Sequence, residues 1–176
     1  MLNIYRIITG YLEENCYIVN IGSDALIIDP GDDSNKIIEY ISNNNFNVLA
    51  ILITHHHFDH VGALDDVKEE YSNAKVIDFN NKDDVKIGPF KFKIIKNYGH
   101  TMDSVSYYFE NDKVMFVGDF IFKGTIGRFD DENEEEMFKS LDRFKSLDES
   151  IKIYPGHGDY TYVGYELDTN PFLRGF

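Results

Sequence analysis

The chain has 176 residues, of which 43% are apolar and 15% aromatic, enough to build one domain with a substantial core. Its 17 basic and 31 acidic residues give a formal net charge of −14, which argues against binding to nucleic acid or to an anionic membrane surface. The single cysteine, Cys16, excludes an intramolecular disulfide framework and is typical of a reducing compartment. No signal peptide or membrane-spanning run is recognisable, so we expect a single domain over residues 1–176 in the cytoplasm, with its oligomeric state left open.

The first half of the chain alternates between apolar runs and turn signals. Apolar, β-branched runs bounded by Gly, Asn and Asp predict strands over residues 2–9, 16–21, 25–29 and 48–53. Apolar residues at helical spacing predict helices over residues 34–43 and 63–71.

The second half repeats this order. We predict strands over residues 74–77, 85–87, 90–97, 105–109, 113–117 and 152–154, and helices over 134–146 and 162–168. Two halves that each combine strands with helices predict an α/β protein, an αββα four-layer sandwich in which helices cover two packed sheets. The polar motifs follow strands, so we expect the functional site at one edge of the two sheets, on loops.

Histidines are concentrated directly after the strand predicted over residues 48–53. Four of the six histidines lie between His55 and His60. In an extended segment His55 and His57 fall on the same side and can bind one ion together, whereas on a helix they would point apart. Asp59 and His60 follow and can serve a second ion. The alternative is a solvated loop that happens to be rich in histidine, but imidazole and carboxylate together are the ligands that borderline metals prefer.

Three later residues complete the set of candidate ligands. His100 follows Gly99, Asp119 follows Gly118, and His157 lies between Gly156 and Gly158. Neighbouring glycines permit tight turns and a close approach of the backbone. Together with the first cluster these residues supply five imidazoles and two carboxylates, a number that suits two metal ions.

The motif T-H-x-H-x-D-H, over residues 54–60, resembles that of the metallo-β-lactamase superfamily. Within it the chain is similar to the type II glyoxalases (hydroxyacylglutathione hydrolases), in a short, single-domain form. The stretches that carry this resemblance are residues 26–31, 99–101, 117–128, 155–158 and 164–173.

The resemblance implies a role for each candidate residue. His55, His57 and His100 would hold the first ion, Asp59, His60 and His157 the second, and Asp119 would bridge both. Asp59 and Asp119 would be the catalytic carboxylates. His56 occupies a variable position and is expected to point away. Asp29 and Thr54 would support the ligands, since ligating imidazoles need a partner for the second ring nitrogen, although Thr54 could equally cap a turn.

The sequence departs from the glyoxalase pattern in places. Type II glyoxalases have an additional C-terminal helical region that supplies part of the glutathione site, and this sequence stops without it. Asp130 replaces a tyrosine of the family, and Asp103 stands where a glycine is frequent, a change expected to cost little. Arg128 remains as a cation that can bind a substrate carboxylate, or it is a surface arginine paired with Asp131.

The expected function is hydrolysis of a hydroxyacyl thioester, such as lactoylglutathione, by a metal-bound hydroxide. Two divalent ions are the expected cofactors, with zinc as the first choice and iron or manganese as alternatives. A thiolate leaves readily, which fits the absence of a further histidine to act as an acid. The alternatives are a mononuclear iron persulfide dioxygenase, a metallohydrolase of another small ester or lactone, and a metal-binding relative that has lost catalysis.

Overall fold

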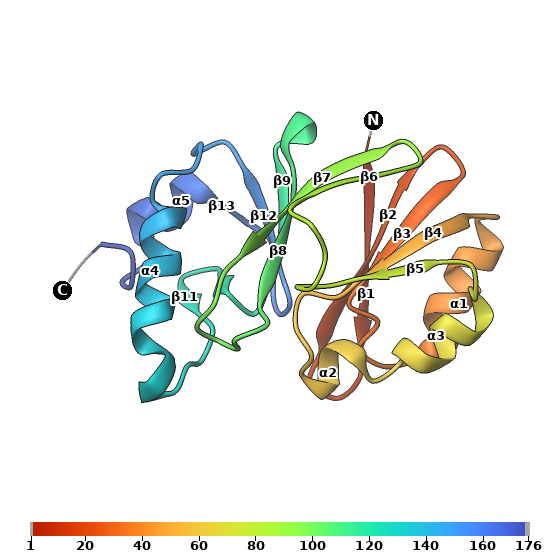
Figure 1. Ribbon diagram of the computed structural model, residues 1–176, viewed down its shortest axis with the longest axis horizontal. Coiled ribbons are helices and arrows are strands. Elements are labelled where there is room, and N and C mark those ends of the chain that lie inside the picture. Colours follow the sequence, from red (N-terminus) through yellow and green to blue (C-terminus); the bar gives the residue numbers. More distant parts are fainter. Residues whose placement is uncertain (1, 175–176) are drawn as a thin grey trace.

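Two β-sheets pack face to face, and helices cover both outer faces (Figure 1). The computed structural model describes residues 2–174; Met1, Gly175 and Phe176, which belong to the predicted domain over residues 1–176, lie outside the described residues. The predicted αββα four-layer sandwich is confirmed.

The first sheet contains five strands in chain order: β1 (Asn3–Thr9), β2 (Glu14–Ile21), β3 (Asp24–Ile28), β4 (Asn47–Leu52) and β5 (Lys75–Ile77). The first three are antiparallel, whereas β3, β4 and β5 run parallel to one another. Parallel neighbours need crossover connections, which α1 (Ser34–Asn43) and α3 (Leu64–Glu70) supply. Their buried residues Ile37, Ile41 and Val67 pack on the outer face of this sheet.

The second sheet has the strand order β13–β12–β9–β8–β7–β6. Its strands are β6 (Asp84–Ile87), β7 (Phe90–Lys96), β8 (Val105–Phe109), β9 (Val114–Gly118), β12 (Lys152–Pro155) and β13 (Thr161–Tyr162). The helices α4 (Glu134–Phe144) and α5 (Val163–Thr169) lie on its outer face. Met137, Leu141 and Phe144 of α4 fill the core between helix and sheet.

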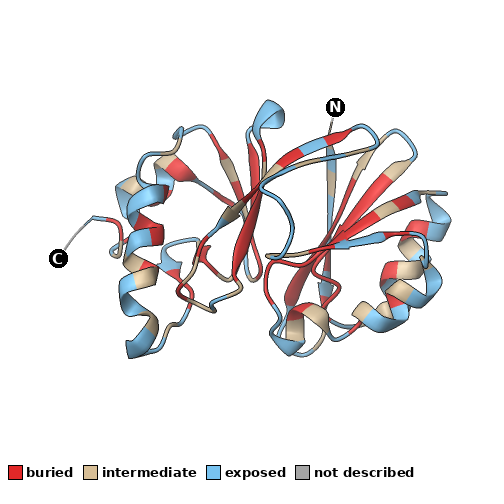
Figure 2. Ribbon diagram, in the orientation of Figure 1, coloured by how far each residue is buried: buried red, intermediate tan, exposed pale blue. Residues whose placement is uncertain are grey.

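Aromatic side chains fill the space between the two sheets, where the strands are buried in Figure 2. Phe92, Tyr107 and Phe116 of the second sheet are at most 2% exposed there. The hydroxyl of Tyr107 donates toward the carbonyl oxygens of Ile53, at 2.6 Å, and Ile77, at 2.8 Å. This contact holds the second sheet against the end of β4, directly before the histidine motif.

Most predicted elements occur within one or two residues of their predicted ends, but four short ones were not predicted. They are the helix α2 (Phe58–Val61) and the strands β10 (Ile121–Phe122), β11 (Thr125–Ile126) and β13. Short 3-10 turns also occur at Glu110–Asp112 and Asp131–Asn133. Segments of two to four residues are too short to carry a periodic apolar pattern, so tertiary contacts define them.

A membrane-spanning helix needs about 20 residues. In the part of the chain that the structure describes, no helix has the length and apolar character to cross a membrane.

Candidate metal centre

The candidate ligands lie on loops at one edge of the two sheets. Strands β3 and β4 are parallel, as are β9 and β12, so the carboxyl ends of each pair meet at the same edge. Asp29 follows β3, His55 and His57 follow β4, Asp119 follows β9 and His157 follows β12. The fold therefore brings together residues more than a hundred positions apart.

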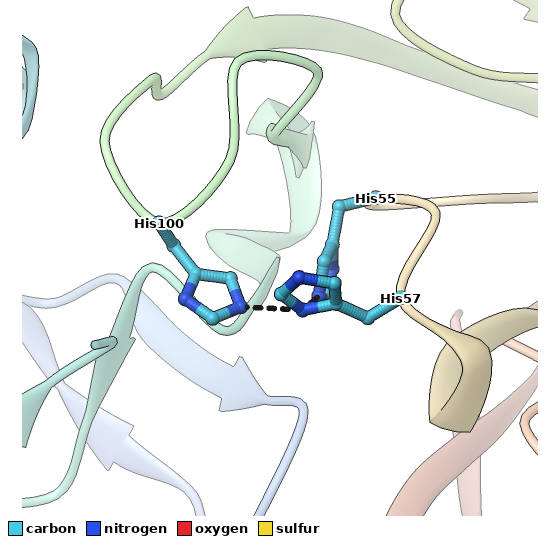
Figure 3. A group of neighbouring side chains, drawn as sticks. All are labelled: His55, His57 and His100. Carbon is cyan, nitrogen blue, oxygen red and sulfur yellow. Dashed lines mark hydrogen bonds between the residues drawn. The ribbon is translucent and has the colours of Figure 1, made fainter. Parts of the chain in front are cut away.

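His55, His57 and His100 form the first group of neighbouring side chains (Figure 3). Nε2 of His55 lies 3.1 Å from Nδ1 of His57, and Nε2 of His100 lies 2.9 Å from the same atom. The backbone of His57 is extended, with φ −67° and ψ 147°. An extended segment places His55 and His57 on the same side, as predicted, and His100 meets them from the loop after β7.

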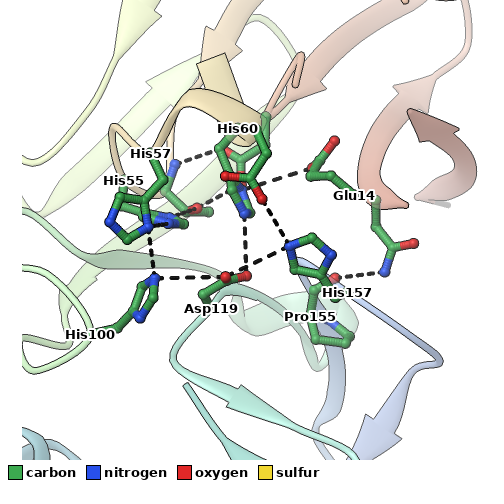
Figure 4. Close-up of polar contacts among 12 residues, drawn as sticks. Glu14, His55, His57, His60, His100, Asp119, Pro155 and His157 are labelled. Atoms are coloured by element: carbon green, nitrogen blue, oxygen red, sulfur yellow. Dashed lines mark hydrogen bonds and ion pairs between the residues drawn. The ribbon is translucent and has the colours of Figure 1, made fainter. Parts of the chain in front are cut away.

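Asp59, His60 and His157 form the second group. Figure 4 shows His60 and His157 of this group beside Asp119. The short helix α2 carries Asp59 and His60, so one turn of helix redirects the chain after the extended histidines. Nε2 of His157 lies 3.2 Å from Oδ2 of Asp59. In each group the candidate ligand atoms lie within 4.8 Å of one another, close enough to bind one ion.

Asp119 lies between the two groups. Its Oδ1 is 3.2 Å from Nε2 of His60, and its Oδ2 is 3.6 Å from Nε2 of His100 and 3.7 Å from Nε2 of His157. Nε2 of His60 and Oδ1 of Asp119 are buried atoms that face each other without a hydrogen bond. A Cβ on Gly156 would collide with the Asp119 carboxylate and the His60 ring, so only glycine permits this approach. Buried polar atoms without partners fit a cation shared between the groups.

Four of the five imidazoles are held by Nδ1 and present Nε2 to the centre of the site. The Nδ1 partners are the Thr54 hydroxyl for His55 at 3.1 Å, the Asp29 carboxylate for His60 at 2.9 Å, the Arg128 carbonyl for His100 at 2.6 Å, and the Leu12 carbonyl for His157 at 3.1 Å. A hydrogen bond at Nδ1 leaves the Nε2 lone pair free for a metal, and this arrangement orients ligating histidines in metal sites. The side chains therefore fit a pair of metal ions.

Burial and neighbouring charges set the protonation of the centre. Burial lowers the pKa of His55 to about 2, and burial together with His100 lowers the pKa of His57. Burial would raise the pKa of Asp119, but His60 lowers it to about 2. Burial would lower the pKa of His60, but the carboxylates of Asp119 and Asp29 raise it well above its ordinary value. Neutral His55 and His57 beside ionised Asp119 are the forms that bind metal ions.

Asp29 and Thr54 form hydrogen bonds with these imidazoles and with each other. Asp29 has a positive φ of 50°, and its carboxylate accepts hydrogen bonds from the Thr54 amide at 2.7 Å and the Thr54 hydroxyl at 2.6 Å. The same carboxylate also accepts from Nδ1 of His60. One buried carboxylate in a strained conformation therefore fixes both the loop before His55 and the ring of His60.

Sequence reasoning missed Glu14, which is 1% exposed and lies beside the site. Its Oε2 accepts from Thr9 at 2.8 Å, and its Oε1 is 3.9 Å from Nδ1 of His60 without a hydrogen-bond partner. Burial raises its pKa well above the ordinary value. The prediction placed residues 10–15 in a loop, but Glu14 and Asn15 belong to β2. A charged residue two positions before the apolar stretch at residues 16–19 was the available signal.

His56 does not simply point away, because it pairs with Asp103. Its Nδ1 lies 2.6 Å from Oδ2 of Asp103, and its backbone amide donates to the same oxygen at 3.2 Å. These contacts join the loop that carries His55 and His57 to the turn that follows His100. Asp103, which stands where the family frequently has a glycine, therefore connects the two ligand loops in this chain.

We expect Asp103→Ala to lower the free energy of unfolding by about 0.5–1 kcal/mol, since the pair is partly exposed. This corresponds to a fall of roughly 1–4 °C in Tm, measurable by calorimetry. His56→Ala should produce a similar loss, and the double variant should lose little more than either single variant. Asp112→Ala, at an exposed position outside the site, is the control. Strictly additive losses for His56 and Asp103 would contradict the pairing.

Arg128 lies at the edge of the first group. It is exposed, and with His57, His100, Phe129 and Asp130 it lines a cavity of about 260 Å³. Its carbonyl anchors His100, so its main chain already belongs to the site. The guanidinium is thus available at the mouth of a cavity that reaches two candidate ligands.

Comparison with known proteins places this site in a family. The profile of the metallo-beta-lactamase superfamily matches residues 9–78 and 72–157. The chain is 33% identical to the probable metallo-hydrolase YqgX of Bacillus subtilis, covering 97% of each chain. It is 32% identical to the hydroxyacylglutathione hydrolase GloC of Haemophilus influenzae, covering 98% of this chain and 99% of that protein.

The fold agrees with these sequence matches. The crystal structure of BLEG-1 B3 metallo-beta-lactamase superimposes with a TM-score of 0.92 at 30% identity, covering 98% of this chain and all of that one. The family match includes strands of both sheets and every candidate ligand. The chain belongs to the metallo-beta-lactamase superfamily, whose members include metallo-hydrolases.

Proposed function

We propose that this protein is a metal-dependent hydrolase that cleaves a small hydroxyacyl thioester. His55, His57 and His100 would hold one divalent ion, Asp59, His60 and His157 would hold a second, and Asp119 would serve both. Zinc is the expected metal, because imidazole and carboxylate ligands suit it, with iron or manganese as alternatives. The observation that carries the proposal is the convergence of four Nε2 atoms, each fixed by a hydrogen bond at Nδ1.

When bound, two such ions supply an activated water at neutral pH and polarise the carbonyl of the substrate. The chain's own residues provide orientation. Asp59 and Asp119 would accept hydrogen bonds from the attacking water and orient it toward the thioester carbonyl. Asp29 keeps His60 in place through Nδ1. No side chain has to donate a proton to the leaving group, because a thiolate leaves without one.

A thioester is favoured by the similarity to the hydroxyacylglutathione hydrolase GloC. The similarity to the BLEG-1 B3 metallo-beta-lactamase keeps β-lactams and other small cyclic substrates as alternatives. A persulfide dioxygenase with one iron needs two histidines and an aspartate. The presence of two complete groups, with Asp119 between them, favours two ions over one.

The test measures metal and activity on one preparation. Protein from unsupplemented cells is analysed for metals, then assayed on thioesters, a lactone, a β-lactam and glutathione persulfide with an oxygen electrode. We expect about two divalent ions per chain and the highest kcat/KM on a hydroxyacyl thioester. One iron per chain together with oxygen uptake would show that the protein is a persulfide dioxygenase instead. Turnover of only the lactone or the β-lactam would show that the substrate is not a thioester.

Arg128 is proposed to bind a carboxylate of the carrier thiol. Arg128→Ala should raise KM for lactoylglutathione about tenfold while kcat changes little, since the interaction is a binding contact at the edge of the site. Alanine retains the carbonyl that anchors His100, so the metal content should not change. The control is Lys86→Ala, at an exposed position outside the two groups.

High salt should reduce the difference between wild type and Arg128→Ala, because salt screens exposed charges. A thioester whose carrier thiol has no carboxylate should not distinguish the two proteins. An unchanged KM for lactoylglutathione would leave Arg128 as a surface residue whose main chain alone serves the site.

A further inference from the structure

His157 lies in a short turn that its own residues do little to fix. The turn follows Pro155, the last residue of β12, and has Gly156 and Gly158 on either side of His157 (Figure 4). Glycine loses more conformational freedom on folding than any other residue, so a ligand between two glycines needs contacts from elsewhere to keep one position. The Leu12 carbonyl orients the His157 ring through Nδ1, but it does not hold the backbone that carries the ring.

The backbone of this turn is held by Asn15, near the start of β2 in the first sheet. The Asn15 side chain donates two hydrogen bonds from Nδ2, to the Pro155 carbonyl at 3.0 Å and to the Gly158 carbonyl at 2.8 Å. The Asn15 amide donates to the Gly156 carbonyl at 2.7 Å. Carbonyls on both sides of His157 thus accept hydrogen bonds from a single residue.

Asparagine is suited to this contact by its donors. Asn15 is 1% exposed, so its side chain acts away from water. An amide NH2 group has two N–H donors, whereas a hydroxyl has one and a carboxylate has none. Among short polar side chains, asparagine alone can therefore hold two carbonyls at once.

Two other residues each hold one end of the turn. The Tyr17 hydroxyl donates to the Pro155 carbonyl at 2.7 Å, and the Arg6 guanidinium donates to the Gly158 carbonyl at 2.8 Å. Asn15 joins both ends and so sets the distance between them. If Asn15 is replaced, each carbonyl keeps a donor, and we expect the protein to fold while the turn loses its fixed shape.

The turn packs closely against the metal centre. The Gly156 amide donates to the Gly118 carbonyl at 2.8 Å, directly before Asp119. A Cβ on Gly156 would lie 2.3 Å from Oδ1 of Asp119. Nε2 of His157 lies 3.2 Å from the Asp59 carboxylate. A small displacement of the turn would therefore change the spacing of the second group of ligands.

We propose that Asn15 is a positioning residue for the second metal ion: it joins the two ends of the turn and so holds Nε2 of His157 where the second group binds the ion. This inference rests on the two-ion centre proposed above. The first ion, at the group formed by His55, His57 and His100, should not depend on Asn15.

The test measures metal binding without any substrate. Metal-free protein is titrated with zinc in competition with a chromophoric chelator, which gives an affinity for each ion. Asn15→Ala should weaken the second ion about ten- to hundredfold, the usual effect of losing a partner outside the ligand set, and change the first less than about threefold. Asn15→Ser retains one donor and should lie between wild type and Asn15→Ala. This milder variant also provides the measurement if Asn15→Ala does not fold.

Two controls separate positioning from general destabilisation. Asn20→Ala is the same substitution at the opposite end of β2, where the Asn20 amide donates to the Gly22 carbonyl at 2.9 Å. Ile41→Ala removes a buried side chain between α1 and the outer face of the first sheet, which lowers stability. Both variants should keep both zinc affinities. If Ile41→Ala weakens the second ion as much as Asn15→Ala does, the positioning role is overturned.

A double-mutant cycle shows whether Asn15 acts through His157. His157→Gln identifies the affinity that belongs to the second group, and adding Asn15→Ala to it should reduce that affinity by less than about threefold more. His100→Gln identifies the affinity of the first group, and in this background Asn15→Ala should still weaken the second ion by its full factor. Additive losses of Asn15→Ala and His157→Gln would overturn the inference.

The same titration separates this inference from the proposed reaction. If no thioester is cleaved but Asn15→Ala weakens the second ion, the positioning role stands and the proposed substrate class fails. If thioesters are cleaved and Asn15→Ala binds the second ion as wild type does, the reaction stands and the positioning role fails. A wild-type protein that binds only one ion would overturn both the two-ion centre and the role of Asn15.

Discussion

Asp119→Ala is expected to reduce thioester hydrolysis by about a thousandfold or more, because the substitution removes the carboxylate that contacts both groups of ligands. Oδ1 and Oδ2 of Asp119 lie 3.2–3.7 Å from Nε2 of three histidines, a position that no other side chain in the described part of the chain occupies. Metal content should fall together with kcat. The measurements are steady-state kinetics on lactoylglutathione and elemental analysis of the purified variant.

The fold should survive this substitution. His60 keeps the hydrogen bond from Nδ1 to Asp29, and Asp119 lies in a loop after β9 rather than within the sheet. Circular dichroism should therefore match wild type. The control is Asp112→Ala, at an exposed aspartate outside the site, which should keep full activity. Undiminished turnover by Asp119→Ala would rule out the proposed hydrolytic centre.

Removing the metal ions is expected to abolish activity and to lower Tm markedly. Ligands that bind only the folded state stabilise it by about 4 kcal/mol when free metal is a thousand times Kd. For a chain of this size that is roughly 8–16 °C in Tm. The reason lies in the centre itself, where His60, Asp119 and Glu14 have buried atoms without hydrogen-bond partners. Calorimetry before and after chelation measures the shift.

Adding zinc back should restore both Tm and activity. If manganese or ferrous iron, added under reducing conditions, restores them instead, that ion is the alternative metal. The Asp119→Ala variant serves as the matched control, because its Tm should respond much less to chelation. Elemental analysis checks that the metal has been removed. If wild-type protein without metal keeps both its Tm and its activity, these residues do not form a metal centre.

The layered fold could be predicted from local patterns. Apolar runs of β-branched residues form strands wherever they are buried on both faces, and the run before Thr54 is one of them. Ile37 and Ile41 are four residues apart and lie on the same face of α1, which packs on the first sheet. Such patterns depend on neighbours in the chain, so the sequence carries them directly.

Side-chain pairing across the fold could not be predicted in this way. His56 and Asp103 are 47 residues apart, and Leu12 and His157 are 145 residues apart. Nothing in the local sequence of either partner specifies the other. Glu14 was missed for the same reason, since a glutamate after a turn is usually solvated, and only the packing of β2 against the loop after β12 buries it.

By itself, the sequence determined which chemical groups the protein can offer: five imidazoles and two carboxylates, each placed after a strand or beside a glycine, in a chain with few cations. Those properties follow from residue type and local spacing. Only the tertiary structure decided which ring nitrogen faces inward and which group holds the other nitrogen of four of the rings. These features depend on distant loops that meet at one edge, because the parallel strands that carry them end there.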